Sequence, residues 1–240
     1  MTALVTGGAK RIGQAFASAL ARDGANVIIH FQQSQSEAEG LLDSIRRTGT
    51  QAWALQATLD TADEVNALFQ RAVDAAGRVD IVVNNASIFP ESTLDAFSTD
   101  ELHRCVDVNA MAPLLLGRAL HRCGHGGSVL NLLDCLIADY DKQHAAYHLS
   151  KRMLFTLTRM MAVEYAPKVQ VNAVAPGLVL PPEGKDDAYL ARLAASNPLN
   201  RYGHLDDVIE AGMYLLKSEF VTGQVLFVDG GRHMRGSMYG

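Results

Sequence analysis

The chain has 240 residues, of which 48% are hydrophobic and 20% charged, with a net charge of −5 and a pI near 5.9. This composition supports a packed α/β core and excludes a disordered chain, and the acidic balance argues against nucleic acid as the main partner. No apolar run reaches about 18 residues and no signal-peptide pattern is present, so we expect a cytoplasmic protein that does not bind membranes.

The predicted elements alternate between short apolar strands and amphipathic helices. Strands are predicted at 3–6, Val27–Ile29, Ala52–Gln56, Ile81–Val83, Ser128–Leu133, Val169–Val174 and Gln224–Val228. Helices are predicted at 12–22, Glu37–Arg46, behind the N-cap Thr61, at 100–122 and at about Asp141–Tyr165. This order predicts one α/β domain over 1–240, a Rossmann-type, doubly wound parallel sheet of about seven strands. The segment 178–197 fits no core element and is predicted as a substrate loop or lid.

A glycine-rich turn, Thr6–Gly13, lies between the first strand and the first helix. Gly7 and Gly8 permit a sharp turn, and Gly13 permits a close approach of the helix to the sheet. The helix N-terminus then offers N–H groups and the positive end of its dipole to a pyrophosphate. The spacing does not match G-x-G-x-x-G, so a turn that binds no ligand remains the alternative for this loop taken alone.

The end of the second strand predicts which dinucleotide is bound. An NAD site has a carboxylate there, which accepts a hydrogen bond from the ribose 2′-hydroxyl. Here the strand leads into Gln32, Gln33 and Ser34, and the first acid is Glu37. Arg11, in the glycine-rich turn, brings a guanidinium that can meet a 2′-phosphate. We therefore predict NADP(H) as the cofactor. No metal is expected, because the three cysteines form no spaced pair.

Tyr147 and Lys151 are four residues apart and therefore share one face of their predicted helix. A lysine cation close to a phenol stabilises the phenolate, so the pKa of Tyr147 is expected to fall from about 10 towards neutral. Such a tyrosine can donate a proton to a carbonyl or imine that receives a hydride. Both residue types are common on helices, and the pair gains its weight from the glycine-rich turn.

These features together resemble the short-chain dehydrogenase/reductase family over the whole chain. Asn84–Ser87 follows the fourth strand where that family has Asn-Asn-Ala-Gly, and Pro176–Gly177 matches the turn beneath the nicotinamide. The resemblance implies that Tyr147 donates the proton and that Lys151 lowers its pKa and holds the nicotinamide ribose. It also implies that Asn109 holds a water for proton relay; a structural asparagine that kinks its helix is the alternative.

The chain departs from the family pattern at three positions. In this combination it resembles the pteridine reductases, and more closely the bacterial dihydromonapterin reductases. Asp134 stands at the usual position of the catalytic serine, Arg11 stands where most members have glycine, and Ser87 ends the fourth-strand motif. A carboxylate can accept from the N–H and amino groups of a pterin, which a β-keto thioester lacks. Phe89 is expected to stack on the flat heterocycle. The alternatives are a loop or N-cap role for Asp134 and a core position for Phe89.

The resemblance implies a complete set of site residues. The catalytic residues are expected to be Asp134, Tyr147, Lys151 and Asn109. The substrate residues are expected to be Arg11, Ser87, Phe89, Asp134 and Tyr147. The cofactor residues are expected to be Gly7, Lys10, Arg11, Ile12, His30, Gln33, Ser34, Thr58, Leu59, Asn85, Ala86, Ser87, Tyr147, Lys151, Pro176, Gly177 and Leu178. Two of these depart from the pattern: Thr58 replaces an aspartate that contacts adenine, and Gln33 replaces an arginine of the trypanosomatid pteridine reductases.

The function implied is the NADPH-dependent reduction of a dihydropterin to the tetrahydropterin, in a homotetramer as is usual in the family. Two alternatives remain. A 3-oxoacyl or small-carbonyl reductase of the same fold is disfavoured by Asp134 in place of serine. A non-catalytic NADP sensor is disfavoured by the intact set of Asn109, Tyr147 and Lys151, since a sensor does not need a proton donor.

Overall fold

The computed structural model describes residues 1–182 and 184–234, and its seven strands form a single parallel sheet. The strands are β1 Thr2–Val5, β2 Asn26–Phe31, β3 Ala52–Gln56, β4 Ile81–Asn84, β5 Gly127–Leu132, β6 Val169–Pro176 and β7 Val225–Val228. Their order across the sheet is β3-β2-β1-β4-β5-β6-β7, with every neighbouring pair parallel. The predicted Rossmann-type parallel sheet is confirmed.

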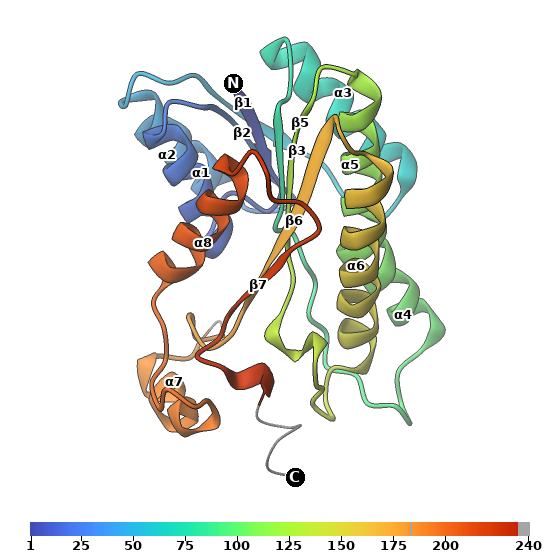
Figure 1. Cartoon of the computed structure of the whole chain (residues 1–240), viewed down its shortest axis with the longest axis vertical. Helices are drawn as coiled ribbons and strands as arrows, with labels where there is room; N and C mark the ends of the chain where they lie inside the picture. The colour runs from blue at the N-terminus through green and yellow to red at the C-terminus, as the bar shows by residue number, and fades with distance from the viewer. Residues whose placement is uncertain (183, 235–240) are drawn as a thin grey trace.

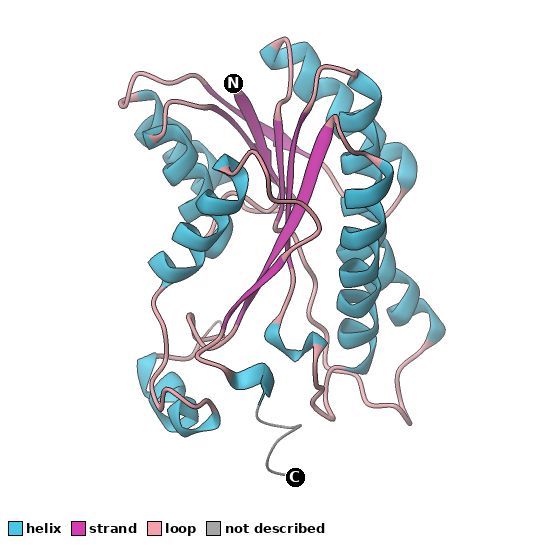
Figure 2. Cartoon of the chain, in the orientation of Figure 1, coloured by secondary structure: helices cyan, strands magenta, loops and turns pink. Residues whose placement is uncertain are grey.

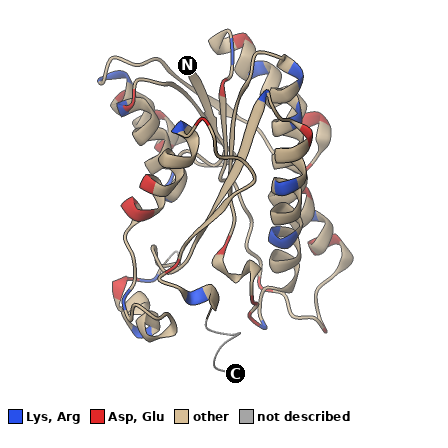
Figure 3. Ribbon diagram, in the orientation of Figure 1, with Lys and Arg blue, Asp and Glu red and all other residues tan. Residues whose placement is uncertain are grey.

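Helices cover both faces of the sheet, as Figures 1 and 2 show. One layer contains α1 Arg11–Arg22, α2 Gln35–Arg46 and α8 Leu205–Lys217. The other contains α3 Ala62–Ala76, α4 Thr99–Val106, α5 Ala112–Cys123 and α6 Ala145–Glu164. The short α7, Asp187–Leu193, lies at the carboxyl end of the sheet, at the bottom of Figure 1. Acidic and basic residues are interspersed over both helical layers (Figure 3).

Two large apolar cores, one on each face of the sheet, hold the layers of the described chain together, and a smaller third cluster includes Leu133 and Leu154. Phe16 of α1 and Val208 of α8 belong to the first core, and Leu116 of α5 and Met161 of α6 belong to the second. The central strands serve both cores, because successive side chains point to opposite faces: Val5 lies in the first and Leu4 in the second. None of the described helices is long and apolar enough to cross a membrane.

The helix predicted at 100–122 is interrupted in the structure. α4 ends at Val106, a π-helical turn spans Asp107–Met111, and α5 follows from Ala112. Pro113 explains the interruption, because it has no N–H to donate to the carbonyl of Asn109 four residues earlier, and its ring crowds that carbonyl. Asn109 therefore lies within a helix distortion, but Pro113 accounts for it and not the Asn109 side chain.

Two further differences concern helix ends and number. The helix carrying Tyr147 begins at Ala145 and not near Asp141, because Asp141 Oδ1 accepts from the main-chain N–H of Gln143 and holds that stretch in a turn. Helix α8 was not predicted at all. The short helix α7 does form within the predicted lid segment, of which residue 183 lies outside the described residues.

Candidate active site

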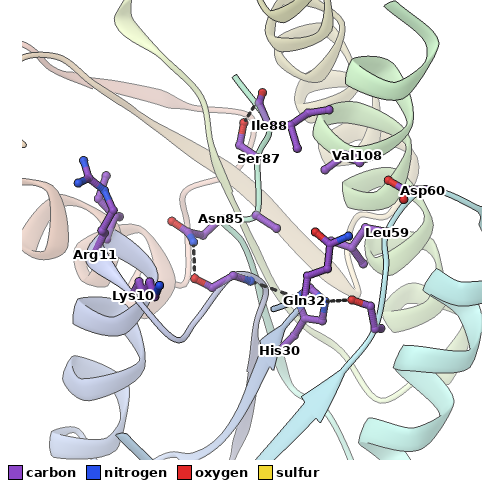
Figure 4. A pocket seen from close by; sticks show the side chains of 14 residues that line it. Lys10, Arg11, His30, Gln32, Leu59, Asp60, Asn85, Ser87, Ile88 and Val108 are labelled. Carbon is purple, nitrogen blue, oxygen red and sulfur yellow. Dashed lines mark hydrogen bonds between the residues drawn. The ribbon is translucent and has the colours of Figure 1, made fainter. Parts of the chain in front are cut away.

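A cavity of about 340 Å³ lies at the carboxyl end of β1, where the strand order reverses between β1 and β4. Ligands of doubly wound sheets bind at this switch point, because the connections leaving the two neighbouring strands diverge to opposite faces. Figure 4 shows the cavity, with Lys10 and Arg11 on one side of Asn85 and with His30, Gln32 and Asp60 on the other.

The glycines of the first turn are required by its geometry. Gly7 has a φ of +58°, in the left-handed region that favours glycine. A Cβ on Gly13 would lie 2.2 Å from the carbonyl oxygen of Gly7 and 2.5 Å from Nδ2 of Asn85, so no side chain fits there. Arg11 also adopts a positive φ, +54°, at the position where the family usually has glycine.

Asn85 and Thr6 brace this turn from the end of β4. Asn85 Nδ2 donates to the carbonyl oxygens of Thr6 and Gly7, each at 3.0 Å. Thr6 Oγ1 in return accepts from the main-chain N–H groups of Asn85 and Ala86, also at 3.0 Å. The side chain of Asn85 therefore shapes the turn through bonds within the protein.

His30 supports the turn from below. Its Nδ1 accepts from the N–H of Gly7 at 3.1 Å, and its Nε2 lies 3.2 Å from the carbonyl oxygen of Ala57. These partners require a neutral ring with the proton on Nε2. Burial lowers the pKa of His30 to about 4, so the ring is neutral over the physiological range. His30 thus connects the β1–α1 turn to the β3–α3 connection.

The first turn of α1 fits a dinucleotide pyrophosphate. The N-cap residue Lys10 makes no side-chain capping bond, and the first turn of the helix contains no acidic residue. N–H groups at this end therefore remain available to an anion, and the helix dipole favours negative charge there. Together with the space that Gly7 and Gly13 leave, this arrangement would hold the phosphates of a bound nucleotide.

The two cations of the turn differ in their surroundings. Lys10 Nζ lies 2.7 Å from Oε1 of Glu37, in the first turn of α2. The guanidinium of Arg11 instead donates from Nη2 to the carbonyl oxygen of Pro181 at 2.7 Å. The predicted contact of Arg11 with a 2′-phosphate remains a prediction: Arg11 lines the first cavity, and its guanidinium is bonded to the lid segment. Lys10 is the cation beside the segment that follows β2.

The cavity lining agrees with most of the predicted cofactor residues. Those that line it are Gly7, Lys10, Arg11, Ile12, His30, Leu59, Asn85, Ala86 and Ser87. The predicted residues that do not line it are Gln33, Ser34, Thr58, Tyr147, Lys151, Pro176, Gly177 and Leu178. The residues that line it without having been predicted are Gln32, Ala57, Asp60, Ile88 and Val108. Gln32 and Asp60 are immediate neighbours in sequence of predicted positions, so the strand ends were identified but the exact side chains were not.

Pro176 and Gly177 lie at the carboxyl end of β6, next to β7. A Cβ on Gly177 would lie 2.6 Å from the Cβ of Asp229, so the close approach of the two strands requires glycine. Leu178 lines a different cavity, of about 460 Å³, between the lid segment and the end of β7. The structure thus places these three residues at the site's edge of the sheet but outside the wall of the first cavity.

The structure brings Asp134, Tyr147 and Lys151 together at the ends of β5 and α6. The hydroxyl of Tyr147 donates to Oδ2 of Asp134 at 2.9 Å, and Oδ1 of Asp134 accepts from the N–H of Leu136 at 2.7 Å. Lys151 Nζ donates to the carbonyl oxygen of Leu132 at 2.7 Å and lies 5.7 Å from the centre of the Tyr147 ring. Tyr147 and Lys151 are both buried.

The predicted direction of the Tyr147 pKa shift is wrong for this structure. Burial, reinforced by the Asp134 carboxylate, raises the pKa of Tyr147 well above its usual value. Burial also lowers the pKa of Lys151 to about 8, although Asp134 opposes this shift. The phenol is desolvated and donates to an anion, and both favour its neutral form. The hydroxyl of Tyr147 therefore keeps its proton and donates it in the hydrogen bond to Asp134.

Asn109 connects the β4 end to α6 through a fully engaged side chain. Its Oδ1 accepts from the N–H of Ile88 at 2.8 Å and from the hydroxyl of Ser87 at 3.1 Å. Its Nδ2 donates to the carbonyl oxygen of Ile88 and to Oγ of Ser150, both at 3.0 Å. The side chain therefore positions neighbouring segments. Because both of its polar atoms are occupied, a relay water at Asn109 would have to bind to the main chain.

Phe89 is half exposed beside Tyr147. Its ring meets the ring of Tyr147 edge to face, with centroids 4.5 Å apart, and stacks on the imidazole of His144 at 3.8 Å. With 52% of its surface exposed, Phe89 is not a core residue. A flat ligand that reached Tyr147 would meet this aromatic ring.

Comparisons with known proteins decide the family. A family model described as enoyl-(acyl carrier protein) reductase matches residues 7–233. A 3-oxoacyl-[acyl-carrier-protein] reductase, FabG of Staphylococcus aureus, is 30% identical over 247 residues, covering 97% of this chain and 98% of that protein. The chain belongs to the short-chain dehydrogenase/reductase family. It is therefore an NAD(P)-dependent oxidoreductase. Separately, the described residues contain no group of three or more His, Cys, Asp or Glu side chains that could hold a metal ion.

Two solved structures of this family are also similar to the chain over nearly its whole length. FolM alternative dihydrofolate reductase 1 from Brucella canis, complexed with NADP, is 34% identical with a TM-score of 0.90, covering 97% of this chain and 94% of that one. The Brucella suis protein of the same name, also in complex with NADP, is 33% identical with a TM-score of 0.91, covering 97% and 95%.

Proposed function

We propose that this short-chain reductase uses NADPH to reduce a dihydropterin, of the dihydromonapterin or dihydrobiopterin kind, to the tetrahydropterin. The observation that carries the proposal is the carboxylate of Asp134 in hydrogen-bond contact with the proton donor Tyr147, next to the half-exposed ring of Phe89. A serine at this position could bind a carbonyl, whereas a carboxylate can only accept. A pterin offers both the donors that Asp134 needs and a flat ring for Phe89.

The chain's own residues would act as follows. The N–H and amino groups of the pterin would compete with Tyr147 for hydrogen bonds to Asp134. This competition would free the hydroxyl of Tyr147 to donate to the nitrogen of the C=N bond. Bound NADPH would supply the hydride that goes to the carbon of that bond. Lys151, held on the carbonyl oxygen of Leu132, supplies positive charge beside the phenol as its proton leaves.

The preference for NADPH rests on charge at the end of β2. This strand is followed by Gln32 and Gln33 where an NAD site has a carboxylate, and Lys10 stands beside the following segment. The 2′-phosphate would compete with Glu37 for Lys10. The similar Brucella proteins were both crystallised with NADP, which supports the same choice here.

The second candidate is a 3-oxoacyl or small-carbonyl reductase. The similarity to FabG of Staphylococcus aureus favours it, since 30% identity over the full length is close to the values for the FolM structures. Asp134 argues against it, because the carbonyl oxygen of such a substrate would offer this carboxylate a lone pair and no proton.

One assay separates the two candidates. The protein is mixed with NADPH or NADH and a panel of dihydropterins, acetoacetyl thioesters and simple ketones, and turnover is followed at the nicotinamide absorbance. We expect turnover of at least one dihydropterin with NADPH preferred. Brisk turnover of acetoacetyl thioesters with none of any dihydropterin would establish the second candidate.

We further propose that the chain forms a homotetramer and that 178–197 acts as a lid. Exposed apolar side chains on α6, namely Leu149, Met160 and Val163, and the fully exposed Phe220 after α8 support self-association. The hydrogen bond from Arg11 to Pro181 supports the lid, because it joins this segment to the glycine-rich turn. The molar mass of the protein, measured by light scattering as it elutes from a size-exclusion column at several concentrations, tests the homotetramer.

A further inference from the structure

The ring of Phe89 is held by aromatic contacts with the first turn of α6. It stacks on the imidazole of His144 with centroids 3.8 Å apart and planes inclined by 17°, and it meets Tyr147 edge to face at 4.5 Å and 89°. Because half of Phe89 is exposed, burial in a core does not fix it. Its position beside the proton donor therefore depends on what holds His144.

His144 is itself held in one orientation. Its Nδ1 lies 2.9 Å from both carboxylate oxygens of Asp141, and Oδ1 of Asp141 also accepts from the N–H of Gln143 at 2.7 Å. The main-chain N–H of Asp141 donates to Nε2 of His148, a buried residue of α6. The imidazole that supports Phe89 is thus bonded to Asp141, and Asp141 is in turn bonded to His148 of α6.

The segment carrying Phe89 is also attached to α6 through Ser92. The carbonyl oxygen of Ser92 accepts from the N–H of Ala145 at 2.8 Å, and its Oγ accepts from the N–H of Ala146 at 3.1 Å. The N–H of Ser92 donates to the carbonyl oxygen of Gln143. The N-cap residue His144 makes no side-chain capping bond of its own. Ser92, distant in sequence, therefore caps the helix that carries Tyr147.

We infer that Ser92 and His144 are positioning residues that hold the ring of Phe89 beside Tyr147. Ser92 fixes the backbone of the β4–α4 connection on the start of α6, and His144 fixes the ring. The stacking surface and the proton donor then form one rigid unit, so a flat substrate does not have to order the loop when it binds. This inference rests on the proposed function, in which Phe89 stacks on the substrate.

Kinetics of paired variants test the inference. His144→Ala is expected to raise the dihydropterin KM about 5- to 50-fold, the range for a weakened stacking contact, with kcat changed less than about threefold. His144→Phe, which keeps a ring under Phe89, should restore KM to within about threefold of the native value. Ser92→Ala should raise KM in the same direction, and Ser92→Thr, which keeps the hydroxyl, should raise it less. The control is Tyr140→Ala, which removes an exposed aromatic of the same loop.

A reporter without substrate separates this inference from the proposed function. Trp53 is the single tryptophan of the chain, so Phe89→Trp in a Trp53→Phe background places one fluorophore at position 89. His144→Ala added to it should increase acrylamide quenching and lower the fluorescence anisotropy.

The outcomes are distinct. Loss of restraint at the reporter in a protein that reduces no dihydropterin refutes the proposed function and leaves the positioning role standing. An unchanged reporter overturns the positioning role, whether or not KM rises, because a rise in KM would then come from direct contact of His144 with substrate. A changed reporter with an unchanged dihydropterin KM also overturns it, since the contact would then be structural only.

Discussion

The hydroxyl of Tyr147 donates to Oδ2 of Asp134 at 2.9 Å, while Lys151 is held on the carbonyl oxygen of Leu132. The phenol of Tyr147 is therefore paired with an anion and not with a cation. This arrangement keeps the phenol protonated, because the carboxylate and burial both raise its pKa. Under the proposed function, a substrate that hydrogen-bonds to Asp134 would remove part of this effect and free the hydroxyl at the same moment. The pair would then couple recognition of a donor-rich substrate to proton transfer.

Tyr147→Phe is expected to lower kcat by about 10²- to 10⁴-fold, the usual contribution of a positioned acid. The affinity for NADPH should change little, because Lys151 stays in place. Single-turnover kinetics with dihydropterin and a fluorescence titration with NADPH measure the two quantities. Near-normal turnover in Tyr147→Phe would remove this tyrosine from the mechanism.

Asp134→Ser should lower kcat/KM for a dihydropterin by about 10- to 100-fold, because hydrogen bonds to charged groups contribute about 1.5–3 kcal/mol. Activity on simple ketones should be kept or raised, since serine can donate to a carbonyl. The variant also removes the carboxylate that raises the pKa of Tyr147, so the alkaline limb of the kcat profile should move to lower pH. Equal losses on both substrate classes would show that Asp134 does not select the substrate.

Gly13→Ala and Gly40→Ala form a matched pair. A Cβ on Gly13 would lie 2.2 Å from the carbonyl oxygen of Gly7, so the turn must distort, with an expected cost of about 1–3 kcal/mol and weakened NADPH binding. Gly40 lies exposed within α2 with nothing near its Cβ position, so alanine should stabilise the protein by about 0.5–1 kcal/mol. Urea unfolding and NADPH titration test both; a tolerated Gly13→Ala would mean that the turn is more adaptable than this close contact implies.

Sequence patterns located this site because its parts follow the ends of parallel strands. Four features have spacings that can be recognised without a structure: the turn at Gly7, the asparagines at the end of β4, Asp134 after β5 and the Tyr147–Lys151 pair. These features are local in sequence, and the structure has them at the predicted strand ends. A kinked helix at Asn109 was only the alternative interpretation, and Pro113, the local signal that accounts for the distortion, was not used.

The remainder depends on contacts between distant segments. Which of Gln32 and Gln33 faces the cavity is set by how the chain leaves β2, and Arg11 is turned to the lid by a bond to Pro181, 170 residues away. The capping of α6 by Ser92 spans 54 residues. The direction of the Tyr147 pKa shift depends on burial, which the spacing of two residues on a helix does not contain.

The stability of the ligand-free protein should depend on pH through His30. The unfolded chain binds a proton at this residue below about pH 6.5, whereas burial lowers the pKa in the folded state to about 4. Between these values the unfolded state carries the extra proton, so the free energy of unfolding falls by up to about 1.4 kcal/mol for each unit that the pH decreases. His30→Asn, which keeps an acceptor for the N–H of Gly7, should show a shallower decline in urea unfolding. Parallel curves for the two proteins over this range would contradict the assignment.

Selectivity for NADPH should depend on Lys10 more than on Arg11. Lys10→Met removes the cation but keeps the aliphatic stem, and we expect about 5- to 30-fold weaker NADPH binding with NADH nearly unchanged, allowing for the exposure of this side chain. Glu37→Gln should act in the opposite direction, because it removes the carboxylate that competes with a 2′-phosphate for Lys10. Arg11→Ala should alter the ratio of the two affinities less, since its guanidinium is bonded to the carbonyl oxygen of Pro181. Calorimetric titration of both nucleotides into the three variants measures these differences. Equal weakening of NADH and NADPH binding in Lys10→Met would show that Lys10 does not select the nucleotide. A selective loss of NADPH binding in Arg11→Ala alone would assign the role to Arg11 and show that its bond to Pro181 breaks when the nucleotide binds.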